Sequence, residues 1–166
     1  MQKLKIEFKS SSSIIGEAPI LSEVKKIVAG AWLSASDSFE ASNDARKEHK
    51  KPLKVGKQAN LNKELESRFC DGGWQGLNGR FFKENTWIRF SFRHSMSLGS
   101  DFLEAFRVYK LEQFQTVCLM YADEEFLREI WPSGGQALCS FEKANAYWAQ
   151  LHTVIDMPLA LGRLHN

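Results

Sequence analysis

The sequence lacks the features of secreted, membrane-spanning and zinc-binding proteins. Its three cysteines show no C-x-x-C spacing and no charged-then-apolar leader opens the chain, so neither a disulfide framework nor secretion is expected. No apolar run approaches the ~18 residues that a membrane helix needs. Four scattered histidines form no H-x-x-x-H pair, which argues against a zinc site. We therefore expect a cytoplasmic protein with no membrane partner and no bound metal.

An excess of charge of one sign is also missing, but the charges are unevenly placed. The 166 residues carry a formal net charge of +2, whereas the segment Arg46–Lys57 holds six Lys or Arg residues and one acid, Glu48. A basic segment on a nearly neutral protein indicates contact with a polyanion. The alternative is a solvated loop that only keeps the protein soluble. The length favours one domain over residues 1–166, large enough to bury a core.

Periodicity predicts an α/β or α+β protein with a mixed sheet. Residues 34–59 are polar and without clear period, which predicts an unusually long functional loop. The apolar run 116–121 predicts a strand covered on both faces. We expect Asn60 to cap the second helix. The predicted helices cover 19–28, 61–69, 101–112 and 141–151, and the predicted strands cover 3–9, 79–83, 87–93, 116–121 and 158–162.

The most informative segment is Trp87–His94. Its apolar residues Ile88, Phe90 and Phe92 alternate with polar residues, as in a strand with one buried face. The run 79–83 precedes it across a turn at 84–86, so the two strands are expected to form a hairpin. The polar face of the second strand carries Arg89, Ser91 and Arg93. We expect this face to be exposed and basic.

Several strings along the chain together resemble the BglII/BstYI-type restriction endonucleases. The order and spacing of these strings extend over nearly the whole chain. The resemblance implies a PD-(D/E)XK fold, in which a mixed β-sheet is flanked by helices. It also implies a homodimer that hydrolyses phosphodiester bonds of duplex DNA with Mg²⁺. The strings are Asn60-Leu61-Asn62-Lys63-Glu64-Leu65 with Phe69, Gly73 and Trp74, then Asp101-Phe102-Leu103 through Phe126-Leu127, Ser133-Gly134, and Pro158-Leu159-Ala160-Leu161-Gly162.

The resemblance also implies where a metal site should lie. In that family an Asp and a Glu hold Mg²⁺ in the pattern Asp-x9-Glu-x-Gln, because hard cations bind carboxylate oxygens. The resemblance places the Glu at Arg89 and the Gln at Ser91, while Gly79 and Arg80 stand where the Asp is needed. An arginine cannot ligate a cation and would repel Mg²⁺. Both metal-binding carboxylates are therefore expected to be missing.

Three interpretations of function follow. In the first, the chain is an inactive nuclease fold without a cofactor that retains DNA affinity through Arg80, Arg89, Arg93 and His94. In the second, Glu84, Asp101 or Glu104 has taken over a ligand role in a working Mg²⁺-dependent type II endonuclease. In the third, the fold serves as a protein-interaction module in a defence, counter-defence or mobile-element setting. A purely structural alternative is that Arg89 pairs with Glu84 or Glu104 and has no functional role.

The DNA-recognition loops implied by the resemblance correspond to residues 44–57 and 133–140. Lysines in the first loop are expected to contact phosphates, which gives affinity but little sequence information. Base readout needs polar side chains that reach the major groove, for which Asn43, Gln136 and Ser140 are candidates. The expected phosphate contacts are Lys47, Lys50, Lys51, Lys54 and Lys57.

Overall fold

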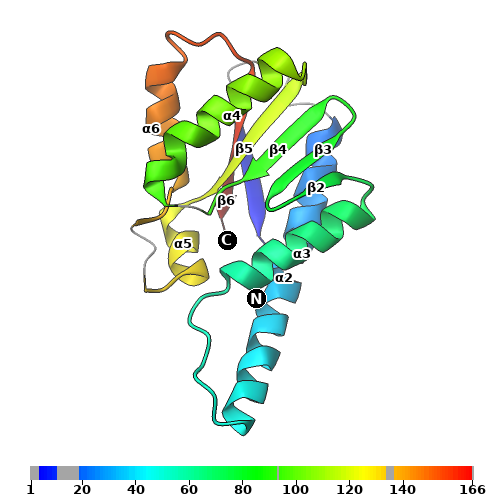
Figure 1. The fold of residues 1–166 in the computed structure, drawn as a ribbon, viewed down its shortest axis with the longest axis vertical. Helices are drawn as coiled ribbons and strands as arrows, with labels where there is room; N and C mark the ends of the chain where they lie inside the picture. Colours follow the sequence, from blue (N-terminus) through cyan, green and yellow to red (C-terminus); the bar gives the residue numbers. More distant parts are fainter. Residues whose placement is uncertain (1–3, 11–18, 93, 134–136, 166) are drawn as a thin grey trace.

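The structure is a computed structural model that describes residues 4–10, 19–92, 94–133 and 137–165. Within these residues a mixed six-stranded sheet has the order β1-β6-β5-β4-β3-β2 (Figure 1). Strands β4, β5 and β6 run parallel, and the other neighbouring strands pair antiparallel. The strands are β1 (Lys5–Ser10), β2 (Gln75–Leu77), β3 (Arg80–Lys83), β4 (Thr86–Phe90), β5 (Thr116–Ala122) and β6 (Leu159–His165).

Helices cover both faces of the sheet. Helices α2, α3 and α5 share one hydrophobic core with it, and α4 and α6 share a second. Strand β5 contributes alternate side chains to the two cores, Cys118 and Met120 to the first and Leu119 and Tyr121 to the second. The prediction of a strand covered on both faces is confirmed. The helices are α2 (Pro19–Glu48), α3 (Gln58–Asp71), α4 (Leu98–Leu111), α5 (Glu124–Ile130) and α6 (Phe141–Leu151).

The β3–β4 hairpin is confirmed at the place that the sequence predicts. Phe82 lies opposite Trp87 and Lys83 opposite Thr86, so a two-residue turn joins the strands. The first turn residue, Glu84, has φ 52°, which an L-residue adopts in tight turns at some cost. Strand β4 ends at residue 90, three residues earlier than expected.

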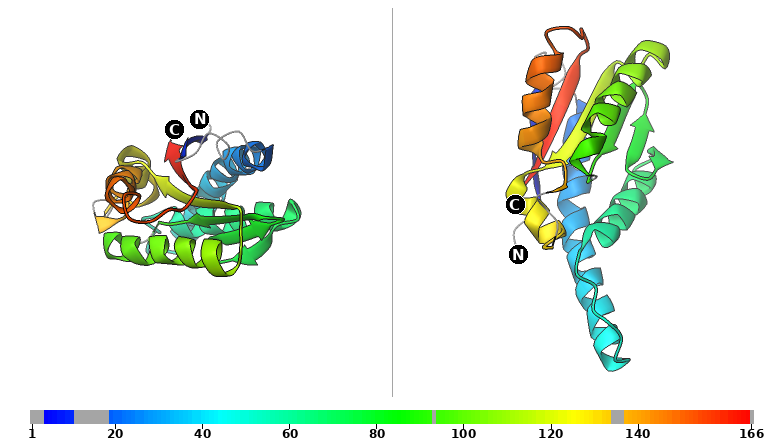
Figure 2. Two further views of the ribbon diagram at one scale, coloured as in Figure 1. Left: turned by 90° about the horizontal axis from the view of Figure 1, so that it is seen from above. Right: turned by 60° about the vertical axis from the view of Figure 1, so that its left-hand side comes forward.

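Residues 34–59 do not form the predicted long loop. Helix α2 is 30 residues long and ends at Glu48, so only residues 49–57 connect it to α3. The last part of α2 lacked an apolar stripe because it leaves the core: none of residues 37–48 is buried. Figure 2 shows this part projecting beyond the sheet with the connection running back beside it. We call residues 37–57 the arm. Neither α2 nor any other helix in the described residues is long and apolar enough to cross a membrane.

Three smaller features also differ from the sequence predictions. Helix α3 begins at Gln58, so Asn60 lies inside it and does not cap it, and Lys57 stands at the N-cap without a side-chain bond. Strand β2 and helix α5 were not predicted. Asp123 caps α5 by accepting a 2.8 Å hydrogen bond from the Phe126 backbone N–H. This cap followed by two glutamates is a helix-start signal that was available in the sequence.

Glu23 ties α2 to the hairpin. It accepts hydrogen bonds from Trp74 Nε1 and Lys83 Nζ, both at 2.9 Å, and Lys83 also donates to the Gly72 carbonyl. Burial opposes ionisation of Glu23, but the hydrogen bonds from Lys83 and Trp74 outweigh it and lower the pKa of the carboxyl. The end of strand β3 is thereby attached to α2.

Candidate functional site

Arg89 is buried in the interior of the sheet. Strand β4 lies between β3 and β5, and Arg89 is only 4% exposed. The prediction of an exposed basic face is therefore wrong at Arg89 and at Ser91, which is fully buried, while Arg93 lies outside the described residues. Helix α4 covers that face, because its Phe102, Ala105 and Val108 pack in the same core as Trp87. Trp87 shares a strand face with Arg89 and was the available signal that this face is covered.

Helix α4 supplies the charges that balance Arg89. Asp101 and Glu104 are three residues apart, so both lie on one face of the helix. Arg89 Nη2 lies 2.9 Å from Asp101 Oδ1, and Arg89 Nη1 pairs with Glu104 Oε2. Glu104 is one of the two partners that the sequence predicts for Arg89. Asp101 is a second partner that was not foreseen in this role.

Arg80 approaches the same glutamate from the neighbouring strand. It lies opposite Arg89 in the β3–β4 pairing. Its Nε donates to Glu104 Oε1 at 2.6 Å and its Nη2 to Oε2 at 3.3 Å, a two-pronged contact that suits a guanidinium. The Arg80 side chain is 44% exposed, in contrast to Arg89. We call Arg80, Arg89, Asp101 and Glu104 the charge cluster; its formal charges cancel.

Asp101 is the most buried member of the charge cluster, with no exposed surface. Besides Arg89 it accepts a 2.6 Å hydrogen bond from Ser91 Oγ and a 3.5 Å contact from the Tyr121 hydroxyl. Burial, helped by the Asp101 carboxylate, raises the pKa of Tyr121 well above its ordinary value. The tyrosine therefore stays protonated and donates. Tyr121 was missed in the sequence because it sits in an apolar run.

The donor set of the charge cluster does not fit a Mg²⁺ ion. The two carboxylates converge on a guanidinium, which offers only N–H donors and no electron pair for a metal. Among the described residues no group of three or more His, Cys, Asp or Glu could hold a metal ion. The cluster as it stands instead fixes α4 against the hairpin through charge-assisted hydrogen bonds.

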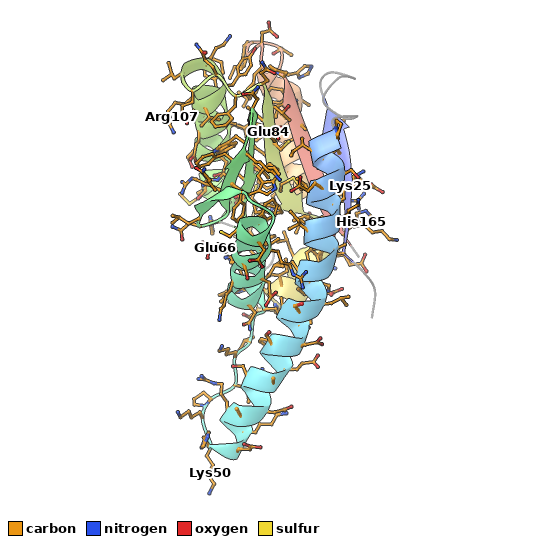
Figure 3. The ribbon with its side chains drawn as sticks, turned by 90° about the vertical axis from the view of Figure 1, so that its right-hand side faces the viewer. Lys25, Lys50, Glu66, Glu84, Arg107 and His165 are labelled. Atoms are coloured by element: carbon orange, nitrogen blue, oxygen red, sulfur yellow. The ribbon has the colours of Figure 1, made fainter. Side chains whose placement is uncertain are left out.

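The remaining acidic candidate, Glu84, does not join the charge cluster. It lies exposed in the hairpin turn, five residues before Arg89, or about 16 Å along an extended chain. Figure 3 shows it on the hairpin, away from the end of α2. Asp101 and Glu104 are thus the two acidic candidates that the structure brings together.

The structure places all five candidate lysines in the arm, four of them toward its far end. Figure 3 shows Lys50 at the far end of α2. Lys47 pairs with Asp44 at 2.8 Å, while Lys51 and Lys54 are exposed. Lys57 lies apart from them at the base of the arm, where its ammonium sits 5.2 Å from the ring centroid of Trp32. The exposed lysines form a basic end to the arm.

The other DNA-contact candidates are a buried serine, an exposed histidine and two residues outside the described part of the chain. Ser140 is 1% exposed and its hydroxyl caps α6 by accepting from the Lys143 N–H. His94 caps the short 3₁₀ helix Ser95–Ser97 by accepting from the Met96 N–H. Arg93 and Gln136 lie outside the described residues.

Comparison with solved structures identifies the fold class as that of a restriction endonuclease. A crystal structure of restriction endonuclease BglII complexed with a DNA 16-mer matches with a TM-score of 0.61 at 15% sequence identity, covering 99% of this chain and 79% of that chain. Free BglII matches with a TM-score of 0.58 at 13% identity, covering 99% and 80%. No family model and no curated protein sequence matches this chain. The likeness defines the fold, and the predicted mixed sheet flanked by helices is confirmed.

Proposed function

We propose that this chain binds duplex DNA and has lost Mg²⁺-dependent cleavage. One observation carries the loss of cleavage: a buried arginine, Arg89, stands where the sequence resemblance requires a metal-binding glutamate. Asp101 and Glu104 hold its guanidinium, so it cannot swing aside without leaving the fully buried Asp101 without its cationic partner. Arg80 adds a second positive charge near the position of the missing Asp. A divalent cation would meet repulsion and no carboxylate free to bind it.

The DNA-binding part of the proposal is supported by the arm. Lys50 lies at its end, and Lys47, Lys51 and Lys54 stand within four residues of it in the sequence, so a duplex could meet several of them together. Lysines on a projecting element suit contacts with phosphates, which fix position and give affinity without reading sequence. The similar protein BglII has been crystallised with a DNA 16-mer. We include a homodimeric state and a single domain in the proposal, both checked by light scattering and limited proteolysis.

Salt-dependent binding tests the DNA contact. Each phosphate contact contributes about 0.9 to the slope of log affinity against log salt concentration. Replacing Lys50 and Lys54 by glutamine should therefore weaken binding of a 16-base-pair duplex and lower the slope by about 1.8. The matched control replaces Lys26 and Lys63, two exposed lysines outside the arm, and should change the slope little. Equal effects of the two double variants would show that the arm has no special role.

Plasmid cleavage tests the loss of activity. With Mg²⁺ or Mn²⁺ the chain should leave supercoiled plasmid intact at concentrations that saturate binding. Cleavage that needs the divalent ion and stops in the Asp101→Asn and Glu104→Gln variants would contradict the proposal. The Glu84→Gln variant serves as the control, because that carboxylate lies outside the charge cluster.

That contradictory outcome would favour the second candidate function, an endonuclease with a rearranged site. The observation in its favour is the convergence of Asp101 and Glu104 on one cationic group. An active site there would require Arg89 to move away, so that both carboxylates could accept a metal ion. Cleavage by the wild type would be the first sign of this rearrangement.

A further inference from the structure

The returning part of the arm is a fixed, extended segment that forms no strand of the sheet. Residues 51–56 run beside α2 without regular secondary structure. At one end the Lys51 N–H donates to the Arg46 carbonyl at 2.8 Å, and at the other the Lys57 N–H donates to the Ile130 carbonyl at 2.8 Å. The segment is therefore held in place at both ends.

Side chains of α2 occupy one edge of this segment. The Asn43 amide accepts from the Lys54 N–H at 2.9 Å and donates to the Lys54 carbonyl at 3.2 Å, as a neighbouring strand would. Arg46 Nε donates to the Pro52 carbonyl. In an extended chain the backbone groups of successive residues point to opposite edges. Residues 52 and 54 thus face α2.

The backbone groups of Leu53 and Val55 point to the other edge. Within the described part of the chain they make no hydrogen bond. The side chains are 49% and 64% exposed and lie on the same face of the segment, with Lys54 on the opposite face. The N–H groups and carbonyls of these two residues are thus available to a partner, on a segment that the contacts with α2 already hold in place.

We propose that this outer edge, Leu53–Val55, pairs with an extended segment of a partner protein that alternates apolar and acidic residues. Main-chain pairing at an open strand edge is a common mode of peptide recognition. Apolar partner side chains would cover Leu53 and Val55, and acidic ones would face Lys54. No acid lies between residues 49 and 57, so the exposed Lys50, Lys51 and Lys54 select an acidic segment. A second copy would bring the same lysines, which repel. This interaction is additional to the proposed DNA binding.

In the test, the capped peptide acetyl-Val-Glu-Val-Glu-Val-Glu-Val-amide is titrated into the full chain, and the backbone amide signals of the protein are recorded by NMR. Binding should shift the Leu53 and Val55 amide signals and slow their hydrogen exchange. The Val55→Pro variant removes one outward N–H and keeps every charge, so it should weaken the peptide by about fivefold, the worth of one net hydrogen bond. The control Val55→Ala keeps the N–H. If Val55→Pro misfolds, a peptide N-methylated at alternate residues should bind the wild type as weakly.

Three results would overturn the proposal. If Val55→Pro and Val55→Ala bind the peptide equally well, only charge attracts it. The same follows if the wild type binds the N-methylated and the unmodified peptide equally well. Equal binding of a Val-Lys peptide would remove the acidic requirement. Loss of duplex affinity in Val55→Pro would assign the edge to DNA. Val55→Pro leaves all lysines in place, so it tests peptide binding without removing the proposed phosphate contacts. Failure of the DNA proposal would appear in duplex binding, and failure of this one in peptide binding.

Discussion

Arg80 and Arg89 contact the same carboxylate from neighbouring strands, but only Arg89 is buried. Substituting each by methionine therefore gives a matched pair of variants. Arg89→Met leaves Asp101 fully buried without its cationic partner, and breaking such a pair from one side costs about 3–5 kcal/mol of unfolding free energy. Arg80→Met removes a guanidinium that is 44% exposed, for which about 1 kcal/mol or less is expected.

Urea unfolding followed by tryptophan fluorescence measures both costs, with an unchanged m-value as the check that the transition is the same. Adding Asp101→Asn to Arg89→Met should recover part of the loss, because the asparagine removes the unbalanced charge while still meeting Ser91 and Tyr121. Costs for the two methionine variants within about 0.5 kcal/mol of each other, the usual scatter of surface substitutions, would refute the claim that Arg89 is an internal counter-ion.

Three further predictions concern other parts of the chain. Lys50→Gly should raise the free energy of unfolding by about 1 kcal/mol, because Lys50 has φ 53° and glycine avoids that steric cost; no gain in a urea titration would contradict it. Glu23→Gln should lower the free energy of unfolding at pH values above 4.5, and its difference from the wild type should shrink as the pH falls, because the pKa of Glu23 is lowered in the folded protein. A difference that grows on acidification would contradict this prediction. A thiol reagent at neutral pH should modify only Cys70 in the native protein, because burial raises the pKa of Cys118 and Cys139 to about 12. Rapid reaction of all three cysteines without denaturant would show that Cys118 and Cys139 are not buried.

The sequence predicts best the elements that lie against the sheet. The run 116–121 and the helix over 141–151 carry unbroken apolar patterns because both pack in the cores, and their structure agrees closely with the prediction. The end of α2 could not be found in this way, since it packs against no sheet. Its stop signal was also hidden, because Lys50 takes the left-handed position after the helix that glycine usually takes.

The site was only partly predictable for a different reason. Alternation along strand 87–93 separates two faces but does not tell that helices cover both of them, so Arg89 was expected to be exposed. Asp101 and Glu104 were identified as candidates, but their convergence on Arg89 depends on how α4 crosses the hairpin. That crossing is set by packing between segments distant in sequence, which single-residue patterns do not record.

The charge cluster also restricts how this chain can change by mutation. A glutamate at position 89 would meet Asp101 and Glu104 directly, leaving three acids with Arg80 as the one cation of the cluster. Such an intermediate would lose stability before any gained function could be selected. Substitutions at 101 or 104 would have to come first, although each alone unbalances the existing arginine. The charge cluster thus constrains its own members: no single substitution that changes the charge at position 89, 101 or 104 keeps its charges balanced.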